Sequence, residues 1–119
     1  MEKFDIQTAS RSNWVAMRQV LSACALEPDE QLVREDLDEL FVFEGVRGVK
    51  WMFAELGWLS ADSERDLERF EEAAIAIFDL GDRAYDDDVV RTSGEWRALR
   101  SAARACLMSM ADRPWVAGA

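Results

Sequence analysis

The sequence has no histidine, only two cysteines, two prolines and six glycines in 119 residues. Without histidine, the chain lacks the commonest general base and the commonest metal ligand. So little proline and glycine excludes a loop-built or fibrous protein. No apolar run reaches the roughly 18 residues of a membrane-spanning helix, and the first residues lack the basic and apolar regions of a signal peptide. We therefore expect a cytoplasmic protein that does not enter a membrane.

The two cysteines, Cys24 and Cys106, are too few for a zinc site, and no histidine can complete one. A disulfide between them would need an oxidising compartment, which no secretion signal indicates. We expect both to be small, buried, hydrophobic side chains.

Catalytic motifs are also missing. The run Asp86–Asp88 lacks the alternating oxygen ligands and the glycine turn of an EF-hand loop. There is no Glu-x-x-His pair for a di-iron bundle, and no glycine-rich loop follows a strand pattern. No spacing singles out two carboxylates for hydrolysis. We expect the protein not to be an enzyme and to need no metal or other cofactor.

Half of the residues are apolar and 32% are charged, which is typical of a folded domain. At this length one domain is expected. We predict a single helical domain over residues 1–119, with flexible ends at about 1–8 and 115–119.

The net charge of −10 is unevenly distributed. Residues 1–26 carry a net charge of +1, residues 27–90 of −14 and residues 91–119 of +3. Such an acidic middle repels nucleic acid and anionic membranes, so direct nucleic-acid binding is disfavoured. It suits a basic protein partner or a decoy for a nucleic-acid-binding surface, although solubility alone also explains it.

Five segments show the 3.6-residue periodicity of amphipathic helices. Proline 28 favours a helix start because the first helical position needs no N–H donor. Ser60 is a candidate N-cap, and Thr92 and Glu95 form a capping-box pattern. The segments begin near residues 12, 28, 46, 61 and 93 and end near residues 26, 45, 59, 81 and 113.

These segments predict an all-α fold, a compact bundle of about five helices with no significant sheet. Residues 40–43 form an apolar run in which the last three are β-branched or aromatic, and they favour, as an alternative, a short extended piece. The predicted core positions are Trp14, Met17, Leu21, Cys24, Ala25, Leu32, Val33, Leu37, Leu40, Phe41, Val49, Met52, Phe53, Leu56, Leu59, Leu67, Phe70, Ala74, Ile77, Phe78, Trp96, Leu99, Ala103, Leu107 and Met110.

Several apolar side chains lie off these inner positions. Trp51 and Trp58 are seven residues apart on a second face of the third segment, and Ile75 lies between Glu71 and Asp79. Surplus apolar residues on an acidic domain favour a protein interface, although a central third helix would bury both of its faces. The predicted partner-binding residues are Val42, Phe43, Trp51, Trp58 and Ile75.

The last segment carries a basic row, formed by three arginines with helical spacing: Arg97, Arg100 and Arg104. We expect these arginines to pair with carboxylates of the same chain rather than with an acidic partner.

The small size, acidity and helical periodicity of the whole chain resemble the quorum-sensing anti-activators of pseudomonads. The resemblance lies in length and composition, and it assigns a role to no single residue. It implies a helical homodimer that blocks the dimerisation or DNA binding of a LuxR-type transcription factor. The sequence predicts a protein-binding inhibitor that forms a homodimer. The alternative is a phage anti-CRISPR protein or another nucleic-acid mimic that uses its acidic surface.

Overall fold

The computed structural model describes residues 5–34 and 50–116, and every regular element among them is helical. Three long helices are accompanied by a short helix over residues 50–55 and by three other short elements. The long helices are α1 (Ile6–Cys24), α4 (Ala61–Phe78) and α6 (Gly94–Ser109), and the other elements are α2 (Pro28–Leu32), the 3₁₀ helix η2 (Gly81–Arg83) and α5 (Asp87–Thr92). The described residues contain no strand, which confirms the all-α prediction.

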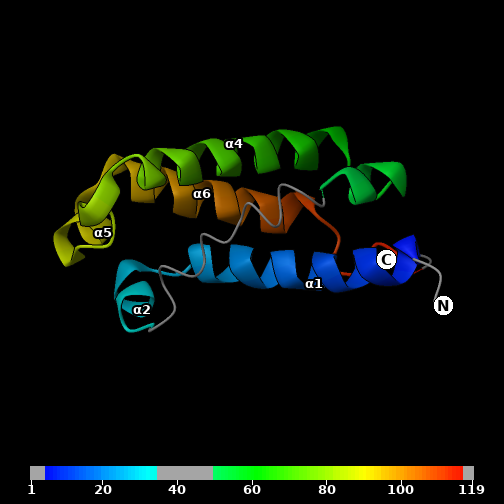
Figure 1. Ribbon diagram of the computed structural model, residues 1–119, viewed down its shortest axis with the longest axis horizontal. Helices are drawn as coiled ribbons and strands as arrows, with labels where there is room; N and C mark the ends of the chain where they lie inside the picture. The colour runs from blue at the N-terminus through cyan, green and yellow to red at the C-terminus, as the bar shows by residue number, and fades with distance from the viewer. Residues whose placement is uncertain (1–4, 35–49, 117–119) are drawn as a thin grey trace.

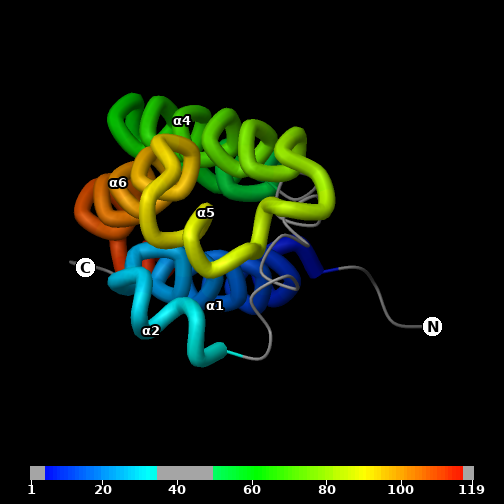
Figure 2. Tube along the Cα trace, turned by 90° about the vertical axis from the view of Figure 1, so that its left-hand side faces the viewer, coloured from blue at the N-terminus to red at the C-terminus, as the bar shows by residue number. Residues whose placement is uncertain are grey.

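The three long helices form the body of the fold (Figure 1). Helix α6 packs against both α4 and α1. Helices α1 and α4 run in the same direction, and α6 runs in the opposite one. Helices α2 and α5 contact each other and lie together at the left-hand end of Figure 1, and Figure 2 shows them in front of the long helices.

Side-chain caps explain where the long helices begin. The carboxylate of Asp5 accepts a hydrogen bond from the backbone N–H of Gln7, so α1 starts six residues before the predicted position. Ser60 caps α4 as predicted, in a reciprocal capping box with Ser63. The cap of α6 is Ser93 rather than Thr92, which instead ends α5.

The buried core lies between the three long helices. The indole nitrogens of its two largest fully buried side chains reach backbone carbonyls: Trp14 Nε1 donates to Ala111 O at 3.0 Å, and Trp96 Nε1 donates to Ala84 O at 2.8 Å. These bonds satisfy groups that would be costly to bury unpaired. The buried apolar residues are Trp14, Met17, Leu21, Ala23, Cys24, Met52, Phe53, Leu67, Phe70, Ala73, Ala74, Ile77, Ala84, Val90, Trp96, Leu99, Ala102, Ala103, Cys106 and Met110.

A buried polar network fixes α2 to the bundle. The Gln31 amide donates to the carbonyl oxygens of Ala23 and Cys24 at the end of α1, at 3.3 and 2.9 Å. Its Oε1 accepts a hydrogen bond from Arg100 Nη1 at 2.9 Å, and the same nitrogen donates to Val90 O at 3.1 Å. One side-chain pair therefore joins α1, α2, α5 and α6.

Several local predictions were wrong. Val33 and Phe78 were placed in the core, but their side chains are exposed. The periodicity also did not predict the short helix α5, in whose first turn Asp87 and Asp88 lie and where the helix dipole favours their negative charge. Residues 35–49, which include the predicted site residues Val42 and Phe43, lie outside the described part of the chain.

The third predicted helix ends earlier than expected. Residues 50–55 are helical, and Gly57 then takes a positive φ of 72°, which only glycine adopts readily. The prediction that Trp58 shares a helix face with Trp51 is wrong, because the helix ends before it.

Among the described residues, no helix is both long and apolar enough to cross a membrane.

Candidate protein-binding surface

Two of the five predicted partner-binding residues are exposed on the described surface. Trp51 keeps 52% of its surface accessible, and Ile75 keeps 40%. Trp58 is only half-buried, but its ring packs on three other aromatic rings. The ring centroids of Trp14, Phe53 and Trp115 lie 5.8, 6.1 and 5.5 Å from it. We therefore assign Trp58 to packing.

Phe78 belongs to the exposed surface that sequence reasoning missed. Its side chain is 75% exposed at the last position of α4, three residues beyond Ile75. Residues three apart in a helix lie on the same face, so the two side chains are neighbours. The signal for this exposure was available, because Ile77 already fills the inner position of that turn and Phe78 lies about 100° further round the helix.

One row of side chains runs along the outer face of α4. Its members are spaced by four and three residues in alternation, which keeps them on one helical face. We call this row the α4 stripe, and it consists of Glu64, Glu68, Glu71, Ile75 and Phe78. Its first half is acidic and its second half is apolar.

The short helix over residues 50–55 lies beside the first half of the stripe, near the start of α4 (Figure 1). Lys50 Nζ donates to Glu71 Oε1 at 2.9 Å, and this ion pair ties the short helix to α4. Between the two helices is a hollow of about 380 Å³. It is lined by Lys50, Trp51, Ala54, Leu59, Glu64 and Glu68.

The charges around this hollow are only partly compensated. Lys50 is engaged by Glu71, and Arg65 lies within 3.4 Å of Asp62 and 3.6 Å of Asp66. Within the described residues, Glu64 and Glu68 form no ion pair. The hollow therefore combines an exposed indole and apolar walls with two uncompensated carboxylates.

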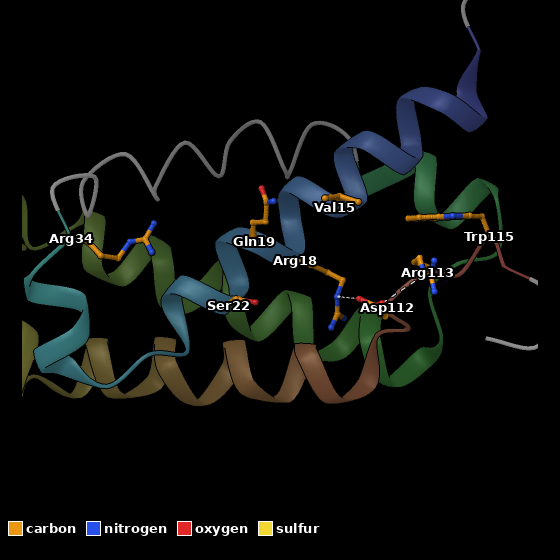
Figure 3. Close-up of a pocket in the computed structure, with 8 residues that line it drawn as sticks. All are labelled: Val15, Arg18, Gln19, Ser22, Arg34, Asp112, Arg113 and Trp115. Carbon is orange, nitrogen blue, oxygen red and sulfur yellow. Dashed lines mark ion pairs between the residues drawn. The ribbon is translucent and has the colours of Figure 1, made fainter.

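A larger hollow of about 670 Å³ lies along α1 and has a different character (Figure 3). Its lining includes three arginines, yet Asp112 pairs with Arg18 at 3.6 Å and with Arg113 at 3.9 Å. Arg18 also donates to Met110 O at 3.1 Å. The basic charge at this end is therefore used within the chain, and the aromatic residue of the lining, Trp115, is less exposed than Trp51.

The basic row on α6 also serves the fold. Arg104 pairs with Glu27 at 2.7 Å and donates to Ala25 O at 3.1 Å, as the prediction of internal pairing requires. Arg100 is bound within the chain as well, although its partners are the neutral oxygens of Gln31 and Val90 rather than a carboxylate. Arg97 is exposed.

The two cysteines of the core are held as neutral thiols. Burial raises the pKa of Cys24 and of Cys106 to about 12, so neither thiol is a ready nucleophile at neutral pH. Both cysteines are free and buried, as predicted. In the described residues, no three His, Cys, Asp or Glu side chains gather closely enough to hold a metal ion.

Comparison of the chain with protein-family models, with curated proteins and with solved structures found no match.

Proposed function

We propose that the protein is a cytoplasmic, non-enzymatic regulator that binds another protein and inhibits it through the face formed by Trp51, Ile75 and Phe78. The observation that carries this proposal is the exposure of these three large apolar side chains, of which Trp51 lies beside the acidic half of the α4 stripe and Ile75 and Phe78 form its apolar half. A solvated helix face normally carries polar groups at such positions. Exposed aromatic residues at interfaces contribute a disproportionate share of binding energy.

The target that the resemblance implies is a LuxR-type transcription factor, whose dimerisation or DNA binding the protein would block. The apolar half of the α4 stripe is suited to such a role, since it offers a helical surface to a helical partner. We also propose that, without a target, a second copy of the chain covers this face in a weak homodimer.

The alternative of a nucleic-acid mimic receives less support. Such a mimic needs rows of free carboxylates, and some of the described ones instead form ion pairs with basic side chains of the same chain. Four such pairs are Lys50–Glu71, Arg104–Glu27, Arg91–Asp29 and Arg18–Asp112.

The test is a comparison of two alanine variants in binding to a partner recovered from the source cells. Trp51→Ala removes an anchor of the proposed face, while Met108→Ala removes an 89% exposed side chain from α6 and is the matched control. We expect Trp51→Ala to weaken binding of the purified partner by about 30-fold, equivalent to about 2 kcal/mol, and Met108→Ala to change it by less than twofold.

Inhibition is measured with the same materials. The partner's own activity should fall stoichiometrically as the protein is added, and it should fall far less with Trp51→Ala. Equal binding by both variants, or a partner whose activity is unchanged when saturated, would contradict the proposal.

A further inference from the structure

The α4 stripe has the dimensions of a docking surface for one helix. From Glu64 to Phe78 it covers 15 residues of α4, a rise of about 21 Å along the helix axis. That length matches about four turns of a partner helix. Because the stripe changes from acidic to apolar along its length, it also gives a bound helix a direction.

The apolar half of the stripe indicates that the partner has an apolar helix face. Ile75 and Phe78 are 40% and 75% exposed and lie one turn apart. A helix that covers them needs apolar residues at i and i+3 or i+4, which is the pattern of an amphipathic helix.

The hollow indicates that the partner also carries basic side chains. Trp51 presents a half-exposed indole beside the two uncompensated carboxylates of Glu64 and Glu68. Arginine and lysine are the side chains that bind both an aromatic face and a carboxylate. The one basic residue of the lining, Lys50, does not compete for these carboxylates, because it is bound to Glu71.

We propose that the partner docks on the α4 stripe with a basic amphipathic helix, an inference that rests on the proposed protein-binding function. Its apolar side chains cover Ile75 and Phe78. About two turns away, its arginine or lysine side chains enter the hollow between Trp51 and the pair Glu64 and Glu68. Charge complementarity favours this occupant over an acidic or uncharged helix, since the lining carries two free negative charges.

The test uses two synthetic helical peptides of about 18 residues, roughly five turns. Both carry the same leucine row, flanked at one end by arginines in the first peptide and by glutamates in the second. Binding of each labelled peptide is measured by fluorescence anisotropy at about 50 and about 300 mM salt, where screening differs strongly. We expect the arginine peptide to bind, to weaken as salt is added, and to bind at least tenfold more tightly than the glutamate peptide.

Charge-changing variants test whether binding of the arginine peptide depends on Glu64 and Glu68. Glu64→Gln combined with Glu68→Gln should weaken the arginine peptide about tenfold and reduce its salt dependence. The matched control, Glu30→Gln combined with Asp82→Asn, removes two exposed charges from α2 and η2 and should change binding by less than twofold. Glu64→Lys combined with Glu68→Lys should reverse the preference, so that the glutamate peptide binds more tightly.

The outcomes separate this inference from the proposed function. If Trp51→Ala weakens the native partner but the glutamine pair does not, the protein-binding function stands and the basic helix is wrong. Failure of the arginine peptide to bind, equal binding of both peptides, or equal effects of the two charge-removing pairs would also overturn it. So would a homodimer that persists at assay concentration and is not displaced by the arginine peptide, because a second copy rather than a basic helix would then be the preferred occupant of the stripe.

Discussion

Replacing Gln31 by leucine tests whether a buried polar network holds the short helices on the bundle. The side chain is fully buried, and its amide donates to Ala23 O and Cys24 O while its oxygen accepts from Arg100. Leucine has a similar volume, so the change removes these hydrogen bonds without opening a large cavity.

The expected cost follows from the bonds that are lost. A hydrogen bond to a charged group contributes about 1.5–3 kcal/mol, and each amide-to-carbonyl bond about 1 kcal/mol. The buried leucine side chain returns part of this sum through its apolar surface. We expect Gln31→Leu to lower the free energy of unfolding by about 3 kcal/mol, a fall in Tm of roughly 12 °C for a chain of this size.

A double-mutant cycle separates the network from simple packing. Arg100→Met alone leaves Gln31 Oε1 and Val90 O without their donor. Together with Gln31→Leu it removes both partners, so the double variant should be less destabilised than the sum of the single variants by about 1–2 kcal/mol. Thermal unfolding gives the Tm, and denaturant unfolding gives the free energy of unfolding, of the wild type, the two single variants and the double variant. A Tm shift below about 3 °C for Gln31→Leu, or additive costs, would refute the reasoning.

Five other outcomes are expected. Trp58→Ala should cost about 3 kcal/mol in a thermal melt, because three aromatic rings lose a neighbour; a loss below about 1 kcal/mol would remove Trp58 from the packing. The thiols of Cys24 and Cys106 should react with a thiol reagent only as fast as the protein unfolds, and immediate reaction at pH 8 would contradict their burial. Since their folded pKa of about 12 exceeds the unfolded value near 9, stability should be fully present below pH 9 and fall as pH rises toward 12, as alkaline unfolding curves will show. Ser60→Ala should cost about 1 kcal/mol through loss of the α4 cap, against no change for Ser101→Ala on the exposed face of α6. Sedimentation should show a dimer at high concentration that dissociates on dilution, and a strict monomer would contradict the homodimer.

The core of the long helices could be predicted because it depends on spacing alone. Trp14, Leu21, Phe70, Ile77 and Leu99 recur at helical intervals, and all are buried. The ends of the helices were harder to predict, because each end depends on the conformation of one or two residues. Helix α1 starts where the Asp5 carboxylate caps it, and the helix over residues 50–55 ends close to the positive φ of Gly57.

The candidate site was predicted only in part, for a related reason. Periodicity placed Ile75 on the exposed face of α4 correctly, since Glu71 and Asp79, one turn away on either side, are charged. The exposure of Phe78 was missed although the spacing contains it, because Phe78 was counted with the inner positions while Ile77 already fills the inner position of that turn. The burial of Arg100 was also hidden, because its partner Gln31 is 69 residues away in the sequence.

The most direct test of the proposed binding face is a paired measurement on Phe78→Ala, in which affinity for the purified partner and stability are determined on the same sample. Its side chain is 75% exposed, so truncation should shift Tm by less than about 2 °C. The affinity should nevertheless fall by about 30-fold or more, as for an interface anchor. An unchanged affinity with an unchanged Tm would contradict the account, because Phe78 would then be an exposed residue that binds nothing.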